Sequence, residues 1–196
     1  MTSDKILSAA RALFEEKGFD LTSVREIATK AEVNVALINY HFGSKENLML
    51  AVMEQSSDAT RMKLHDINQS EATSVEKLLL VIDLYVEKLF DNCRYYHLIH
   101  REMSVVQRPE LVDGINKILN RNTAELRKLI EDGQRKKTFK KSVDIDLAIA
   151  TLFGVIYQVT HAVLGKRWIR AGEDDDAFRK RVKKYLADLL TGYLVK

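Results

Sequence analysis

The sequence contains little of what a disulfide-bonded or turn-rich β protein needs. Among 196 residues there are one cysteine, one proline and eight glycines. The single cysteine, Cys93, excludes an internal disulfide and suits a reducing compartment. The scarcity of proline and glycine favours long helices. The first residues, 1–4, contain no apolar h-region, so we expect no signal peptide and a cytoplasmic location.

The N-terminal quarter also lacks an excess of positive charge. Residues 1–46 hold six Lys and Arg against seven Asp and Glu, and the whole chain has a net charge of +3. A protein that coats nucleic acid without sequence preference usually has a strongly basic surface. Any contact of this segment with nucleic acid would therefore depend on a few placed cations, backbone N–H groups and helix N-termini.

Helical spacing of apolar residues runs through almost the whole chain and predicts an all-α fold. The expected helices follow Ser3, Ser23, Asn34 and Ser44 and then cover 74–93, 95–106, the segment after Pro109, 144–164 and 174–193. We expect a small N-terminal three-helix head and a larger helical body. Two basic clusters, residues 135–141 and 179–184, are interpreted as a solvated loop and the polar face of the last helix.

The segment 22–48 contains the strongest motif. Ser23 and Glu26 form a capping-box pattern at a helix start, and Asn34 can cap a second, short helix. In that short helix Ile38 and Phe42 share the expected buried side, and Tyr40 points away from it. A helix of about two turns is not stable alone in water, so its neighbours must support it. Two helices of this kind can place the second in the DNA major groove.

At these residues the chain resembles the TetR family of transcriptional regulators, with an AcrR-like N-terminal signature. The matching positions are Phe14, Gly18, Thr22, Val24, Arg25, Ile27, Ala28, Val33, Tyr40, His41, Phe42, Ser44, Lys45, Glu46 and Leu48. The resemblance implies a helix-turn-helix DNA-binding domain over 1–46 and a ligand-binding and dimerisation domain over 47–196. The sequence departs from the family pattern at Glu32, where glycine is usual, and at Asn39, where many members have tyrosine.

The expected DNA contacts lie in and around the two short helices. Lys45 and the start of the first short helix, at Thr22 or Ser23, are the expected phosphate sites. The full expected set is Thr22, Ser23, Arg25, Asn34, Val35, Ala36, Leu37, Asn39, Tyr40, His41 and Lys45.

The apolar helix 147–164 needs cover on more than one side, which a second copy of the chain could supply. The resemblance implies a homodimer through the last two helices, and the expected interface comprises Leu152, Ile156, Val159, Val182, Leu186, Leu189 and Tyr193. It also implies a repressor that binds a pseudo-palindromic operator and is released by a small, mostly apolar ligand. The expected ligand site comprises Tyr85, Leu89, Cys93, Tyr96, His100, Met103, Phe153, Tyr157 and His161.

Two other functions compete with this interpretation. One is a DNA-binding regulator controlled by a protein partner. The other is an enzyme that uses His97, His100 and Glu102, but the sequence has no glycine-rich phosphate loop and no nucleophile motif. We therefore expect no catalytic residue, no cofactor and no metal site. The run 147–164 approaches the length of a membrane span, about 20 residues, but polar residues interrupt it, so we expect no membrane insertion.

Overall fold

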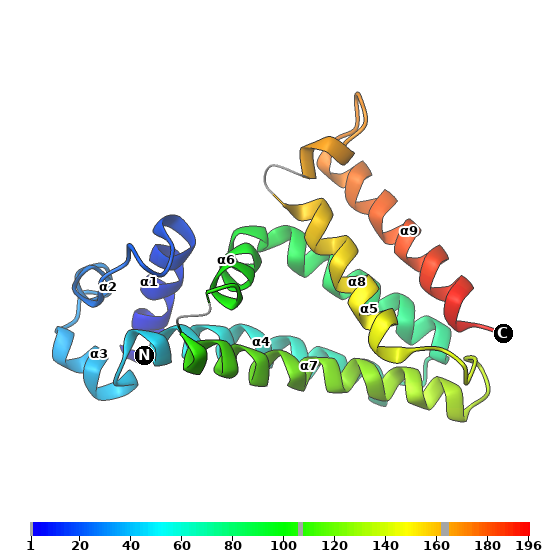
Figure 1. The fold of residues 1–196 in the computed structure, drawn as a ribbon, viewed down its shortest axis with the longest axis horizontal. Helices are drawn as coiled ribbons and strands as arrows, with labels where there is room; N and C mark the ends of the chain where they lie inside the picture. The colour runs from blue at the N-terminus through cyan, green and yellow to red at the C-terminus, as the bar shows by residue number, and fades with distance from the viewer. Residues whose placement is uncertain (1, 106–107, 162–164) are drawn as a thin grey trace. The chain divides into compact units, whose positions relative to one another are not determined.

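The computed structural model describes residues 2–105, 108–161 and 165–196, and in these ranges it contains helices and no strand. The all-α prediction is confirmed. The elements, traced in Figure 1, are α1 (Thr2–Lys17), α2 (Val24–Ala31), α3 (Val35–Phe42), α4 (Lys45–Gln69), α5 (Ser74–Asp91), α6 (Cys93–Met103), α7 (Pro109–Arg135), α8 (Ile145–Thr160), the 3₁₀ turn η1 (Gly165–Trp168) and α9 (Asp175–Leu194).

Several expected boundaries differ from the observed ones. The helix expected over 95–106 is α6, which ends at Met103, and α8 ends at Thr160. The expected ends at 106 and 164 lie outside the described residues. Between the last two expected helices, residues 165–168 form the 3₁₀ turn η1.

The chain divides into two compact units. The head unit comprises Met1–Thr60 and Arg94–Asn120, and the body unit comprises Arg61–Cys93 and Arg121–Lys196. The long helices α4 and α7 therefore each contribute to both units. The functional division expected at residue 46 remains a prediction.

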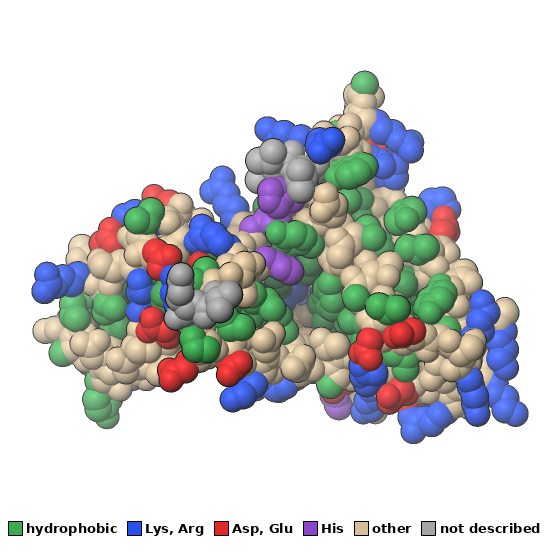
Figure 2. Space-filling view, viewed as in Figure 1, with side chains coloured by type: hydrophobic (Ala, Val, Ile, Leu, Met, Phe, Trp, Pro, Cys, Tyr) green, Lys and Arg blue, Asp and Glu red, His purple; other side chains and the backbone are tan. Residues whose placement is uncertain are grey.

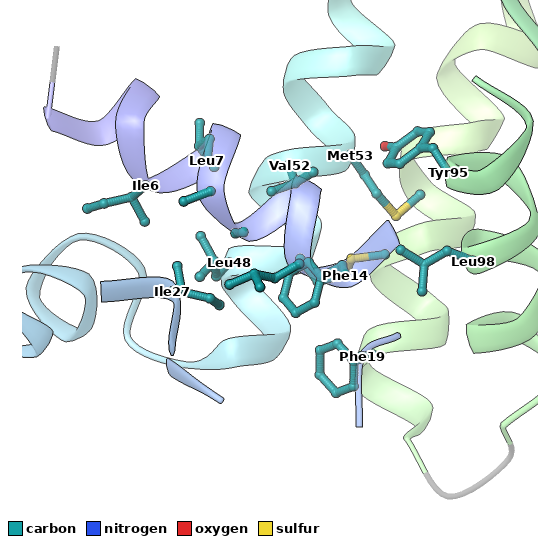
Figure 3. Close-up of a cluster of buried hydrophobic side chains, with 14 of the residues drawn as sticks. Ile6, Leu7, Phe14, Phe19, Ile27, Leu48, Val52, Met53, Tyr95 and Leu98 are labelled. Atoms are coloured by element: carbon teal, nitrogen blue, oxygen red, sulfur yellow. The ribbon is translucent and has the colours of Figure 1, made fainter. Parts of the chain in front are cut away.

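The core of the head unit joins α1–α3 to the helices that follow them. Figure 3 shows Phe14 and Ile27 packed near Leu48 of α4, with Tyr95 and Leu98 of α6 in the same cluster. All five side chains are at most 6% exposed. Burial of one such side chain contributes about 1.5–3 kcal/mol. The helix pair α2–α3 is therefore supported by a core that includes α4, α6 and α7, as a two-turn helix requires.

In the body unit, α5 packs against α8 and α9. The side chains between α5 and α9 include charged ones: Arg179 donates to Glu87 at 2.9 Å, and Lys183 pairs with Glu87 at 2.5 Å and with Asp83. The hydrogen bond from Lys183 lowers the pKa of Glu87 below its ordinary value. Arg179 and Lys183, on the expected polar face of the last helix, therefore bind one helix to another.

The loop between α7 and α8 is also anchored. Phe139 is fully buried and forms an isolated antiparallel bridge with Val195, and Lys140 N–H donates to the carbonyl of Leu194 at 2.8 Å. The basic residues of this loop surround an apolar anchor, so the loop is not simply solvated.

None of the helices in the described ranges is long and apolar enough to cross a membrane.

Candidate nucleic-acid interface

The turn between α2 and α3 is made without glycine. Glu32 adopts the left-handed conformation, with φ 56° and ψ 45°, and its N–H donates to the Thr29 carbonyl at 3.2 Å. The next N–H, of Val33, donates to the Ala28 carbonyl at 3.0 Å. These bonds close α2 as the αL C-terminal motifs of helices do. A non-glycine residue adopts this conformation at a cost of about 1–2 kcal/mol.

Both short helices begin with the predicted caps. The Glu26 N–H donates to Ser23 Oγ at 3.2 Å and the Glu26 carboxylate accepts from the Ser23 N–H at 2.8 Å, which confirms the capping box. The Ala36 N–H donates to Asn34 Oδ1 at 2.8 Å. Glu26 also accepts from Lys17 Nζ at 2.7 Å, and this bond, together with those from Ser23, lowers the Glu26 pKa to about 2.

The α3 helix turns one side inward and the other to solvent. Ile38 is 2% exposed, and Phe42 is half-buried and packs against the same core. Tyr40 is 83% exposed, an unusual exposure for an aromatic side chain. Its ring stands edge-on to that of His41, with centroids 5.3 Å apart. The remaining expected contacts on this helix, Ala36, Leu37, Asn39 and His41, are exposed, and Val35 is half-buried.

The side chain of Thr22 does not face solvent. It is 1% exposed, and its hydroxyl donates to the carbonyls of Gly18 at 2.7 Å and Leu13 at 3.2 Å. The hydroxyl thus satisfies C-terminal carbonyls of α1, and contact of Thr22 with a phosphate remains a prediction. Ser23 and Arg25 are exposed beside it at the start of α2.

Lys45 has an intramolecular role. Its ammonium donates to the carbonyls of Phe19 at 2.9 Å and Thr22 at 3.1 Å and lies 4.3 Å from the centre of the Phe19 ring. Arg108 lies over the same ring, with its guanidinium carbon 4.7 Å from the centre. The carbonyls account for a cation at the start of α4, where the helix dipole opposes positive charge. Contact of Lys45 with a phosphate remains a prediction.

The expected ligand-binding residues belong to both units. Tyr96, His100 and Met103 lie in the head unit; the body unit holds Tyr85, Leu89, Cys93, Phe153, Tyr157 and His161. Burial, and secondarily the charge of His97, lowers the His100 pKa. Tyr85 packs edge-on against Phe153, with ring centroids 4.9 Å apart. Inside the body unit, a gap of about 20 Å³ is lined by apolar side chains of α5, α7, α8 and α9 and is no larger than about one water molecule. The ligand site remains a prediction.

The residues of the expected dimer interface differ in burial. Leu152, Ile156, Val182 and Leu186 are at most 5% exposed and pack mainly inside their own chain. Val159 is half-buried.

A different face of the same helices is apolar and exposed. It includes Leu189 and Tyr193 from the expected set, and also Leu147 at 63% and Tyr185 at 55% exposure. Figure 2 shows hydrophobic side chains gathered over α8 and α9. A groove between α8, η1 and α9 lies in this region and is lined by Gly154, Val155, Gln158, Val159, Trp168, Arg170, Phe178, Arg181, Val182 and Tyr185.

At the alternative site of His97, His100 and Glu102, the carboxylate of Glu102 is engaged in ion pairs. Glu102 is 1% exposed and accepts from Arg108 and, at 3.3 Å, from Arg101. Arg108 also pairs with the exposed Asp20. Within the described ranges, no group of three or more His, Cys, Asp or Glu side chains is arranged to hold a metal ion.

A capped two-turn helix held on a shared core, with its outer side open to solvent, defines a helix-turn-helix DNA-binding protein. Two family models match the chain: bacterial regulatory proteins of the tetR family over residues 6–52, and the C-terminal region of YsiA-like proteins over 53–169. The chain belongs to the TetR family and is a TetR-type transcriptional regulator.

Two relatives and one solved structure illustrate the similarity. The "Probable HTH-type transcriptional regulator YttP" of Bacillus subtilis is 32% identical over 147 residues, which are 70% of this chain and 67% of the relative. The repressor NicS of Pseudomonas putida is 28% identical over 169 residues, 80% and 74% of the two chains. The crystal structure of FadR from B. subtilis in complex with stearoyl-CoA has a TM-score of 0.77 at 24% identity and covers 94% of this chain and 97% of its own.

Proposed function

We propose that this regulator is a homodimeric repressor that binds a pseudo-palindromic operator with α3 in the major groove. The observation that carries the proposal is the exposed side of α3, where Tyr40 projects while Ile38 fixes the helix to the core. The contacting set is the exposed part of the expected one: Ser23, Arg25, Asn34, Ala36, Leu37, Asn39, Tyr40 and His41. Two copies related by a two-fold axis would meet two half-sites about one helical turn, or a multiple of it, apart.

The dimer would form through the exposed apolar face of α8 and α9. Tyr185, Leu189 and Tyr193 are spaced four residues apart on α9 and therefore share one face. Gly154 on α8 has no heavy atom within 4 Å of the place where a Cβ would lie, which leaves room for a close approach of a second helix. Large exposed apolar surfaces of this kind mark interfaces between proteins.

Release would follow binding of a small, mostly apolar ligand. The B. subtilis FadR structure contains stearoyl-CoA, and a regulator from Saccharomonospora viridis with a similar fold contains choline. The shared core of α1–α3 with α6 and α7 supports this mechanism. Because α6 packs in the same core as α2 and α3, a movement of α6 would displace these two helices. To shift the ratio of released to DNA-binding conformation from 1:99 to 99:1, the ligand must prefer the released conformation by about 5.5 kcal/mol.

The test is replacement of Tyr40 by alanine. DNA that the wild type selects from a random duplex pool serves as the probe, and affinity is measured by fluorescence anisotropy at fixed salt. Loss of an aromatic contact at a recognition helix should weaken binding at least tenfold, or about 1.4 kcal/mol. Met62→Ala is the matched control, because Met62 is 67% exposed on α4 and belongs to the body unit. Equal affinities of Tyr40→Ala and wild type would remove α3 from the interface.

A further inference from the structure

We infer that the recognition helix α3 reads adenine–thymine pairs, chiefly through thymine methyl groups and one adenine, and that guanine contributes little. The inference rests on the proposed function and specifies the DNA that the site accepts. Its basis is the chemistry of the exposed α3 side chains: the helix Val35–Phe42 contains no lysine and no arginine. Those are the residues that most often read guanine, through its O6 and N7 atoms.

The first turn of α3 is apolar. A recognition helix meets base edges mainly with its N-terminal residues, and here these are Val35, Ala36 and Leu37. Leu37 is 39% exposed, Ala36 is exposed and Val35 is half-buried. In the major groove the C5 methyl of thymine is the apolar group that such side chains can contact. Guanine and cytosine present no such methyl group in the major groove, so the same side chains gain no apolar contact from a G·C pair.

The next turn supplies an amide. Asn39 is exposed and lies three residues after Ala36, on the same side of the helix. An asparagine amide can bind adenine at N6 and N7 together, and such a pair discriminates against the wrong base by about five- to 150-fold. Asn34, by contrast, uses its side-chain oxygen as the N-cap. Asn39 is therefore the residue of α3 best placed to specify a base by hydrogen bonds.

The cations nearest to α3 in the sequence lie outside that helix. The Lys45 ammonium is held by the carbonyls of Phe19 and Thr22. Arg25 is exposed on α2, and in this motif the first helix crosses the phosphate backbone. His41 is exposed near the C-terminal end of α3, further from the bases than the first turn. We therefore expect at most a peripheral guanine contact, at His41.

The experiment begins with selection of bound duplexes from a random pool by the full chain. In the selected half-site, each thymine is then replaced by uracil, which removes only the C5 methyl, and each guanine by 7-deazaguanine, which removes N7. Loss of one buried methyl should weaken binding about fourfold. We expect such losses at two or more thymines and less than a twofold change at each guanine.

Two variants assign the contacts to residues. Leu37→Ala should abolish the effect of uracil at one thymine position and preserve it at the others. Asn39→Ala should reduce discrimination at one adenine by about five- to 150-fold. Met62→Ala, the exposed control in the body unit, should leave the substitution pattern unchanged.

The outcomes separate the two proposals. If no duplex is enriched at low ionic strength, the proposed function fails. Suppose instead that a duplex is enriched, that 7-deazaguanine substitutions weaken binding, and that uracil substitutions do not. The inference on base readout is then overturned, while the proposed function as a DNA-binding regulator still stands.

Discussion

Removal of Arg108 is expected to be among the most damaging single changes in the head unit. Glu102 is 1% exposed, and its carboxylate accepts from the Arg108 guanidinium and, at 3.3 Å, from Arg101. The Arg101 side chain is 58% exposed, whereas that of Arg108 is 19% exposed. In Arg108→Ala, a buried carboxylate keeps only the more solvated partner. Loss of one member of a buried pair costs about 3–5 kcal/mol.

Because Arg101 remains as a partner of Glu102, we expect Arg108→Ala to lower the free energy of unfolding by about 3 kcal/mol, the lower end of the range of 3–5 kcal/mol. For a chain of this length it corresponds to a fall in Tm of about 6–12 °C. The measurement is unfolding by urea and by heat at pH 7, monitored by circular dichroism. Arg127→Ala serves as the matched control, because it removes an arginine from an exposed pair with Asp146 and should cost less than about 1 kcal/mol.

A double-mutant cycle shows whether the buried charge causes the loss. Glu102→Gln removes the charge while keeping the shape, so in the double variant Glu102→Gln/Arg108→Ala no carboxylate remains buried. We expect the double variant to regain at least half of the stability lost in Arg108→Ala. A double variant as unstable as Arg108→Ala, or a single variant within 1 kcal/mol of wild type, would refute this reasoning.

Three further predictions concern the helix pair and the dimer. Glu32→Gly should raise the free energy of unfolding by about 1 kcal/mol, and Tm by about 2–4 °C, because glycine adopts φ 56° without a Cβ penalty. The folded-state pKa of Glu26 is about 2, below its ordinary value of 4.5, so the stability that its charge contributes is present above pH 4.5 and lost as pH falls toward 2. The difference in Tm between wild type and Glu26→Gln should therefore shrink over that pH range. Leu189→Arg should convert dimers to monomers in light scattering, because it places a charge in the middle of the exposed apolar face of α9.

Each of these has its own control or contrary result. Glu32→Ala removes the same carboxylate but keeps a Cβ, so a gain as large as that of glycine would exclude the backbone explanation. For Glu26, a Tm difference that stays constant from pH 6 to pH 2.5 would mean that the carboxylate contributes nothing through its charge. Lys180→Ala changes an exposed residue on the opposite side of α9 from Leu189 and should stay dimeric. Dimers that persist in Leu189→Arg would place the interface elsewhere.

The sequence alone determined the features that depend on neighbours three or four residues away. The capping box at Ser23 and the cap at Asn34 follow from backbone N–H groups that lie within one turn of the cap. The inward side of α3, with Ile38, and the outward Tyr40 follow from the helical period alone. The all-α class needed no more than this periodicity and the scarcity of proline.

Tertiary structure decided which of two apolar faces is covered. Helix α8 has apolar residues on more than one side. The helical spacing of these residues therefore could not show that Leu152 and Ile156 turn inward while Leu147 stays exposed. It also decided pairings between residues far apart in the chain, such as Lys45 with the carbonyls of Phe19 and Thr22. Such partners are chosen by packing of the whole unit, and no local spacing encodes them.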